Sequence, residues 1–518
     1  MKQPLQRLPI GIQEFEKLRT GGYVYVDKTE QIYDLIDRGS YYFLSRPRRF
    51  GKSLLLSTIK AFFEGKKELF EGLAIAHKDV EWAEHPVLHL DLNTEKYDSK
   101  EKLENVLNDF LYKTELLYGR VESETSVSLR FQGVIERAYK KTGRRVVILV
   151  DEYDKPMLQA IGNKDLQDEY RGLLKGFYGA LKSMDGCIQF AFLTGVTKFG
   201  KVSVFSDLNN LNDISMSRRF YAVCGITEQE LQESFSDNID ALAKECDLTR
   251  EDCIAKLRRM YDGYHFEEKA PGVYNPFSIL NSFWNLKFGN YWFETGTPSY
   301  LVELLQRYDY NLENMSQANV TADVLNSVDA ESKDPIPVIY QSGYLTIKGY
   351  DERFKQYQLG YPNQEVEEGF IQYLTPYYLS KTQDRTAFDV RKFAEDVESG
   401  NPEQFCKRLK SLFADTPYEL VKNLENHYQN IVWVVFKMLG FYTQAEYHTS
   451  EGRIDLVIAT TDYRYVMEFK LDGTAEEALQ QIKSKDYSLP FTMDEKKTYL
   501  IGMNFNRETR NIEKYIIE

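Results

Sequence analysis

The stretch that decides the fold of the N-terminal part of the chain is Tyr41–Ser53, which reads YYFLSRPRRFGKS. Its first four residues form an apolar run typical of a buried strand, and Leu54–Phe63 has the apolar spacing of a helix. A strand, a loop ending in Gly-Lys-Ser and a helix, in that order, are typical of the phosphate-binding loop of nucleoside triphosphatases. We therefore predict a nucleotide site centred on Gly51, Lys52 and Ser53.

The residue types in this loop suit the binding of phosphate groups. Backbone N–H groups at the start of a helix bind anions. We expect Lys52 to contact the β- and γ-phosphates of ATP and Ser53 to offer its hydroxyl to Mg²⁺. The usual pattern begins with glycine, and Arg46 occupies that position here. The residues predicted to surround the nucleotide are Arg49, Phe50, Gly51, Lys52, Ser53 and Leu54.

A second, acidic motif supports the same site. The run Val146–Val150 is apolar and is followed by Asp151 and Glu152. We predict that this strand lies beside the phosphate strand, that Asp151 holds Mg²⁺, and that Glu152 polarises the attacking water. A core strand with a solvated acidic end is the alternative interpretation. The order of the two motifs and their separation of about 100 residues favour the nucleotide site.

A third strand, Ile188–Leu193, ends at Thr194. We predict that Thr194 lies beside the γ-phosphate as a sensor, with a plain strand-end threonine as the alternative. Arg218 and Arg219 could contact a phosphate of the same or a neighbouring subunit, but we interpret them as a solvated surface pair.

The pattern along the chain predicts an α/β fold class with three regions. Residues 1–225 alternate strands with helices, which predicts a P-loop domain built on a parallel sheet. Residues 226–420 predict a helical lid, starting at an N-cap on Thr227, followed by a mixed linker region. Residues 421–518 predict a second α/β domain in the order helix, strand, strand, strand, helix, strand. Its helices and strands are Val421–Leu439, Tyr442–His448, Arg453–Ala459, Tyr463–Leu471, Ala475–Tyr487 and Thr498–Met503.

Two strands of the C-terminal region carry Asp455 and Glu468. A tight turn at Thr461–Asp462 pairs the strands antiparallel and places Asp455 opposite Glu468, with Cβ atoms roughly 5 Å apart. In this register the opposite face is wholly apolar, whereas a slip of one residue would mix the two faces. The hydrophobic pattern therefore favours this pairing.

Two adjacent carboxylates repel each other unless a cation lies between them. Asp455 and Glu468 are therefore predicted ligands of Mg²⁺ or Mn²⁺. Lys470 is on the same face as Glu468 and could orient or deprotonate a water. Gln481 on the next helix belongs to the same predicted catalytic group, and Glu425 on the preceding helix is a further candidate ligand. A network of solvated charges is the alternative interpretation.

Short motifs are spread along most of the chain, and they are Leu8–Gly11, Tyr25–Thr29, Arg46–Ser53, Val150–Asp154, Cys224–Thr227, Tyr261–Tyr264, Tyr274–Phe277 and Gln341–Thr346. Together they resemble the bacterial AAA-ATPase-like family, whose members commonly carry a C-terminal domain of the PD-(D/E)XK nuclease superfamily. The resemblance implies an ATP-binding module in which Arg46 is ordinary. It also points to Asp455, Glu468 and Lys470 as the D…ExK group, and Gln481 matches a glutamine often found after it.

The composition restricts the class of protein. The chain has 518 residues, of which 42% are hydrophobic, and no apolar run reaches the roughly 18 residues that span a bilayer. Its start lacks a signal-peptide pattern, and its five scattered cysteines contain no CxxC pair. We therefore expect a cytoplasmic protein without disulfides, a zinc site or a membrane partner. His265 and His448 are isolated in the sequence. The aromatic residues Trp284, Trp292, Phe293, Tyr340 and Tyr344 are interpreted as core.

Two functions remain open at this stage. The first is an ATP-regulated, metal-dependent nuclease acting on DNA or RNA, which the intact D…ExK group favours. The second is an ATP-dependent switch or scaffold whose C-terminal domain binds nucleic acid or protein without cutting. The net charge of −14 favours the second, because an acidic chain is not typical of tight nucleic-acid binding. A homo-oligomer is compatible with both.

Overall fold

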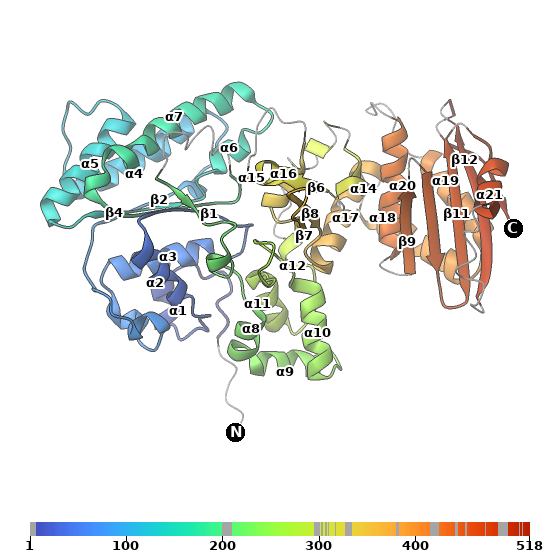
Figure 1. Ribbon diagram of the computed structural model, residues 1–518, viewed down its shortest axis with the longest axis horizontal. Helices are drawn as coiled ribbons and strands as arrows, with labels where there is room; N and C mark the ends of the chain where they lie inside the picture. The colour runs from blue at the N-terminus through green and yellow to red at the C-terminus, as the bar shows by residue number, and fades with distance from the viewer. Residues whose placement is uncertain are drawn as a thin grey trace. The chain divides into compact units, whose positions relative to one another are not determined.

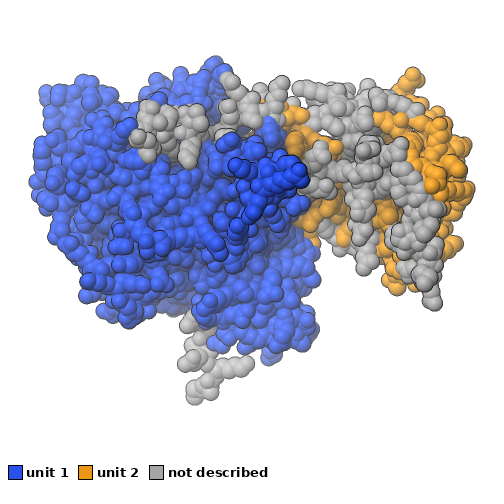
Figure 2. Space-filling view, in the orientation of Figure 1, with its two compact units in different colours: residues 1–296, 317–366 blue, residues 297–316, 367–518 orange. Residues whose placement is uncertain are grey.

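The computed structural model of this chain has two compact units, which Figure 2 shows in separate colours. Unit 1 contains residues 1–296 and 317–366, and unit 2 contains residues 297–316 and 367–518. The domain boundaries expected from the sequence stay predictions. Both units combine helices with sheets, so the predicted α/β class is confirmed (Figure 1).

The structure describes residues 7–198, 210–294, 301, 304–305, 308, 310–315, 318–326, 334–379, 383–414, 424–440, 444–450, 453–471, 473–484, 496–506, 508–509 and 511–518. In these ranges no helix is long and apolar enough to cross a membrane.

A five-stranded parallel sheet forms the centre of unit 1, in the order β2-β3-β4-β1-β5. Its strands are β1 (Tyr41–Ser45), β2 (Val87–Asp91), β3 (Val146–Asp151), β4 (Ile188–Gly195) and β5 (Asn212–Asp213). In Figure 1, one face carries α1 (Phe15–Thr20), α2 (Thr29–Arg38) and α3 (Lys52–Phe63), and the other carries α4 (Lys100–Tyr118), α5 (Val127–Thr142) and α7 (Lys164–Ser183). Helices on both faces explain why β1 and β3 are apolar and buried along their length.

One sequence-based expectation about this sheet is wrong. The strand ending in Asp151 does not lie beside the phosphate strand, because β4 is inserted between β3 and β1. In register, Leu44 pairs with Thr194, and Val150 pairs with Leu193. Thr194 therefore lies between the two motifs rather than beyond them. The order of strands along the chain does not fix their order in a sheet, which depends on how the connecting helices cross it.

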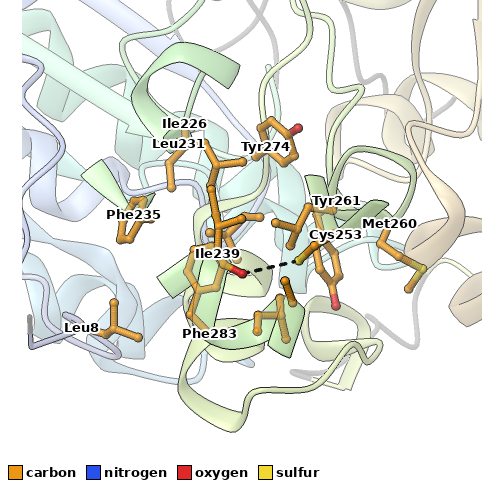
Figure 3. Packing of buried hydrophobic residues seen from close by; sticks show 14 of the residues in the cluster. Leu8, Ile226, Leu231, Phe235, Ile239, Cys253, Met260, Tyr261, Tyr274 and Phe283 are labelled. Atoms are coloured by element: carbon orange, nitrogen blue, oxygen red, sulfur yellow. Dashed lines mark hydrogen bonds between the residues drawn. The ribbon is translucent and has the colours of Figure 1, made fainter. Parts of the chain in front are cut away.

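A helical subdomain follows the sheet in unit 1. It contains α8 (Glu228–Ser234), α9 (Ser236–Glu245), α10 (Arg250–Tyr261) and α11 (Pro276–Asn285). Thr227 caps α8 through a reciprocal capping box with Glu230, as its position in the sequence predicted. Figure 3 shows the core of this subdomain, in which Ile226, Phe235 and Phe283 lie in one cluster with Leu8 from the N-terminal segment. The N-terminal segment and the helical subdomain are therefore packed as one body.

The remaining α-helices and strands of unit 1 are short. They are α6 (Lys155–Gln159), α12 (Tyr291–Glu294), α15 (Ala322–Asn326), α16 (Ile336–Gln341) and a three-stranded sheet of β6 (Asn319–Thr321), β8 (Gln356–Gly360) and β7 (Thr346–Asp351). Trp292 and Tyr344 are buried here, as expected for core residues. Trp284 is 67% exposed, so its assignment to the core is wrong. It lies at the end of an amphipathic helix, where the apolar pattern alone does not distinguish the covered face from its edge.

Unit 2 contains a mixed five-stranded sheet in the order β13-β12-β11-β10-β9. Its strands are β9 (Gln444–Ser450), β10 (Arg453–Ala459), β11 (Tyr463–Leu471), β12 (Lys497–Asn506) and β13 (Asn511–Ile517), the last of which the sequence did not suggest. Its helices are α14 (Leu312–Met315), α18 (Gln383–Glu398), α19 (Pro402–Ala414), α20 (Leu424–Gly440) and α21 (Ala475–Ser484). Another helix, α17 (Gln364–Leu379), begins in unit 1 and continues into unit 2.

The predicted hairpin of unit 2 is confirmed. The Thr460 N–H donates to the Tyr463 carbonyl oxygen at 2.8 Å, and the Tyr463 N–H donates to the Thr460 hydroxyl oxygen at 3.0 Å, so the turn is centred between Thr461 and Asp462. Asp455 is the register partner of Glu468. The apolar face predicted for this register is buried at Leu456, Ile458, Tyr465, Met467 and Phe469.

Gly502 on β12 sets how closely α21 approaches the sheet. It is the register partner of Glu468 on the side away from Asp455. A Cβ atom at position 502 would lie 2.4 Å from the Ala475 carbonyl oxygen and 2.6 Å from the Leu479 nitrogen. Only glycine therefore lets the backbone of α21 pack this closely beside Glu468.

Replacing Gly502 by alanine is expected to push α21 away from the sheet and to destabilise unit 2 by roughly 1–3 kcal/mol, the usual effect of overpacking. Thermal unfolding and hydrogen exchange at α21 and β12 measure the change. Gly172→Ala is the control, because Gly172 is exposed on α7 and a Cβ there meets nothing within 4 Å. Unchanged exchange in the Gly502→Ala protein would contradict this account.

Candidate functional site

Three predicted residues meet at the carboxyl ends of β1, β3 and β4. The Ser53 hydroxyl, in the first turn of α3, donates to Asp151 Oδ2 at 2.5 Å. The Thr194 hydroxyl donates to the other oxygen, Oδ1, at 2.6 Å. Asp151 and Thr194 are both buried. A carboxylate and a hydroxyl at the start of a helix are oxygen ligands of the kind that Mg²⁺ prefers, so these residues could hold that ion.

Lys52 lies in the loop beside this group and is buried. Its ammonium donates to the carbonyl oxygens of Arg46 and Pro47, at 3.1 and 3.3 Å, and lies 3.1 Å from Glu152 Oε1. Glu152 has a φ of 53°, in the left-handed region that non-glycine residues rarely adopt. Such a conformation is strained and clusters at functional sites. It turns the chain at the end of β3 and leaves the Glu152 carboxylate facing the loop lysine.

Arg46 occupies the position of the first glycine of the usual loop, and its side chain contacts the segment that follows β5. Its guanidinium donates to the Ser215 carbonyl oxygen at 2.8 Å and to those of Phe220 and Tyr221 at 3.3 and 3.4 Å. It also stacks on the Phe266 ring, 3.8 Å from the centroid. Burial lowers the pKa of Arg46 to about 10. The side chain thus ties the start of the loop to the segment that follows β5.

The second half of unit 1 also supports the loop. Trp292 donates its indole N–H to the Arg48 carbonyl oxygen at 3.0 Å. The fully buried Glu365 accepts hydrogen bonds from the Trp292 backbone N–H and from the Ser278 hydroxyl, both at 2.7 Å. Sequence reasoning treated Trp292 as core and did not find this role. The aromatic residue itself gave no signal, because its partner is a backbone carbonyl.

Asp154, three residues after the end of β3, links this strand end to the residues that follow β4. Its carboxylate accepts the Thr197 N–H at 2.6 Å and the Thr197 hydroxyl at 2.5 Å. Burial, together with the neighbouring charge of Glu152, raises the pKa of Asp154 to about 6. Of the three carboxylates at this strand end, Asp151 accepts from Ser53 and Thr194, Glu152 faces Lys52, and Asp154 holds the ends of β3 and β4 together.

A cavity of about 100 Å³ opens beside Gly51. Its lining is mostly apolar and comes from the N-terminal segment, from α3 and from the helical subdomain. The lining residues include Pro9, Val24, Val26, Phe50, Leu54, Val223, Cys224, Ile226, Pro276 and Leu280. Lys28 is the charged residue among them. Sequence reasoning named Phe50, Gly51 and Leu54 but missed the rest, which come from distant segments.

Two groups of predicted residues lie outside this arrangement. Arg49 does not line the cavity, and its guanidinium lies 4.9 Å from the centroid of the Phe277 ring. Arg218 and Arg219 are exposed, and Arg219 pairs with Asp34 at 3.3 Å. The interpretation of Arg218 and Arg219 as a surface pair is therefore confirmed.

The second candidate site lies on β11 of unit 2. Glu468 is fully buried, and its Oε1 lies 3.4 Å from the Lys470 ammonium. Lys470 also donates a hydrogen bond to Gln481 Oε1 on α21. The amide nitrogen of Gln481 is buried without a hydrogen-bond partner in the described part of the chain. Three of the predicted catalytic residues are thus brought together by β11 and α21.

The fourth residue, Asp455, is placed by its backbone alone. It is in register with Glu468 on one side and with His448 on the other, so His448 is not isolated in the fold. The side chains of Asp455, His448 and Glu425 lie outside the described residues. Among the side chains that are described, no group of three or more His, Cys, Asp or Glu residues could hold a metal. A cation at Glu468 would therefore need a ligand from outside this set of side chains, and Asp455 is the predicted one.

Comparison with known proteins supports both parts of this architecture. Residues 9–205 match the family described as Predicted AAA-ATPase, and residues 423–515 match the PD-(D/E)XK nuclease superfamily. The chain is also 35% identical over 528 residues, covering 99% of both sequences, to an "Uncharacterized protein in vnfD 5'region" from Azotobacter chroococcum mcd 1. The resemblance inferred from the short motifs is therefore confirmed, and the chain belongs to the AAA-ATPase-like family whose members carry a C-terminal domain of the PD-(D/E)XK nuclease superfamily.

Proposed function

We propose that unit 1 binds and hydrolyses ATP with Mg²⁺, and that ATP regulates a metal-dependent nuclease in the C-terminal domain that acts on DNA or RNA. The observation that carries the first part is the junction of Ser53, Asp151 and Thr194 beside the N-terminus of α3. Helix N-termini attract phosphate, and a carboxylate and a serine hydroxyl at this position suit the Mg²⁺ that accompanies it.

The cavity beside Gly51 supports a nucleotide rather than a free phosphate as the ligand. With the phosphates on the backbone of residues 51–53, the ribose would follow and the base would extend into the apolar cavity beside Gly51. A nucleobase is flat and largely apolar on its faces, so the lining suits it. Phe50 and Leu54 then contact the base, and the Arg49 side chain does not.

Glu152 is proposed as the base for hydrolysis. In the structure its carboxylate pairs with the Lys52 ammonium. Phosphate oxygens of ATP would compete for this ammonium, and the carboxylate would become available to polarise a water. Mg²⁺ would neutralise charge that develops on the phosphates.

The buried Glu468 carboxylate, with Lys470 and Gln481, supports the nuclease proposal. Gln481 would hold Lys470 at a fixed distance from Glu468, so that its ammonium could steady a phosphate or orient a water. A divalent cation on Asp455 and Glu468 would polarise the scissile phosphate.

The net charge of −14 favours the alternative function, a nucleotide-dependent switch or scaffold that binds nucleic acid or protein without cutting.

Lys52→Ala is expected to weaken Mg-ATP binding by at least about tenfold, because a buried ammonium–phosphate contact contributes more than roughly 1.4 kcal/mol. Isothermal titration calorimetry on the full chain measures this change. Lys60→Ala is the control, since Lys60 lies on the same helix with its side chain 35% exposed. Equal ATP affinity in the wild type and Lys52→Ala would refute the nucleotide site.

Glu152→Gln is expected to keep ATP binding and to slow phosphate release by about 100-fold or more, because an amide cannot accept the proton of the attacking water. A coupled phosphate assay measures turnover, and Glu64→Gln at the end of α3 is the control. If the variant hydrolyses ATP as fast as the wild type, Glu152 is not the base. A wild-type protein that binds ATP without turnover would favour the switch.

The nuclease proposal is tested with single- and double-stranded DNA and RNA, with and without Mg²⁺ and ATP. Asp455→Ala is expected to abolish Mn²⁺ binding and cutting, whereas Lys470→Ala keeps the metal and slows cutting. Lys483→Ala is the control and should cut normally, because Lys483 lies on α21 with its side chain 41% exposed. Mn²⁺ binding is read by anomalous scattering from soaked crystals. If the Asp455→Ala protein still cuts nucleic acid, Asp455 is not a ligand of a catalytic metal. A wild-type protein that binds nucleic acid without cutting it would favour the scaffold.

A further inference from the structure

Lys28 is held in a fixed position at the cavity beside Gly51. The preceding residue, Asp27, accepts hydrogen bonds from the Thr29 N–H at 2.8 Å and the Thr29 hydroxyl at 2.6 Å. Its other oxygen accepts the Ala74 N–H at 2.7 Å. One carboxylate oxygen of Asp27 therefore braces the turn that begins α2, and the other connects this turn to Ala74. This turn directs Lys28 to the lining of the cavity.

Lys28 forms an ion pair with Glu230 on α8. Its ammonium lies 2.6 Å from each carboxylate oxygen, and the side chains are only 11% and 22% exposed. Glu230 is itself fixed, because its Oε2 accepts the Thr227 N–H at 2.8 Å in the capping box of α8. Two segments about 200 residues apart in the sequence thus meet in one rigid, mostly desolvated pair.

The pair has unused hydrogen-bonding capacity. A lysine ammonium carries three N–H donors, and in the described part of the chain its partners are the two oxygens of Glu230. Glu230 Oε1 accepts only from Lys28 among those residues, although a carboxylate oxygen has two lone pairs. One donor of Lys28 and one acceptor of Glu230 therefore remain. Lys28 lies in the mostly apolar lining of the cavity, and Glu230 borders the cavity through its contact with Lys28.

We propose that Lys28 and Glu230 recognise the edge of the nucleobase and select adenine over guanine. This inference rests on the proposed nucleotide site. Adenine presents a ring-nitrogen acceptor next to its amino group, which matches an ammonium beside a carboxylate. Guanine presents two acceptors, N7 and O6, on the corresponding edge, so its carbonyl would face the Glu230 carboxylate. The pair would thus attract one purine and repel the other.

A purely structural role is the competing explanation. The same ion pair could only connect the N-terminal segment to α8 and so hold the helical subdomain in place. In that case, loss of the ion pair would lower the affinity of the site for all its ligands equally, because the phosphate contacts and the base contacts would both be disturbed. Selection of the base predicts instead that affinity for nucleotides changes and affinity for a ligand without a base does not.

The test is calorimetry on the full chain with ATP, GTP and inorganic tripolyphosphate, which has no base. The wild type is expected to prefer ATP to GTP by at least about tenfold. Lys28→Met keeps the apolar stem and is expected to reduce this preference to near unity while tripolyphosphate affinity stays unchanged. Lys17→Met, an exposed position on α1, is the control and should keep the preference.

Glu230→Gln provides a second, independent test of base selection. The amide NH₂ can donate to the guanine carbonyl, so this variant is expected to shift the preference towards GTP, again with unchanged tripolyphosphate binding. Base selection would be overturned if Lys28→Met lowered the affinity for all three ligands equally. It would also be overturned if the ratio of ATP affinity to GTP affinity were unchanged in both variants. The Lys52→Ala protein distinguishes failure of base selection from failure of the nucleotide site, because a tripolyphosphate affinity that is unchanged in Lys52→Ala refutes the nucleotide site itself.

Discussion

The parallel register of β3, β4 and β1 is the constraint on which the rest of unit 1 depends. Parallel strands end at the same edge of a sheet, so Asp151 and Thr194 lie beside the loop that follows β1. The hydrogen bonds from Ser53 and Thr194 to the two oxygens of Asp151 require this alignment. A shift of one residue in any of the three strands would move one of these groups to the opposite face of the sheet.

The loop itself is held from several directions by groups that are not part of it. Arg46 fixes its start to the segment after β5, and Trp292 fixes the Arg48 carbonyl. Glu365 in turn holds Trp292, so a buried carboxylate far along the chain supports the loop backbone. Preorganisation of this kind matters because a phosphate site built from backbone N–H groups works only if the loop keeps one conformation.

The C-terminal site depends on a different constraint, the close approach of α21 to β12 at Gly502. This approach brings Gln481 to Lys470, and the alternation of β11 brings Lys470 to Glu468. Each unit therefore places its polar residues by packing apolar surfaces nearby. In unit 1 the same packing joins Leu8 to the helical subdomain and forms the wall of the cavity in which Lys28 lies.

The sequence by itself determined the local features: the strands β1, β3 and β4 of the parallel sheet, the Thr227 cap, and the register that pairs Asp455 with Glu468. These depend on side-chain period, turn position and capping chemistry, which act over a few residues. Only the tertiary structure decided that β4 lies between β1 and β3, that Trp284 is exposed, and that Lys28 meets Glu230. Such contacts join segments distant in the sequence, and no local pattern encodes which distant segment will supply the partner.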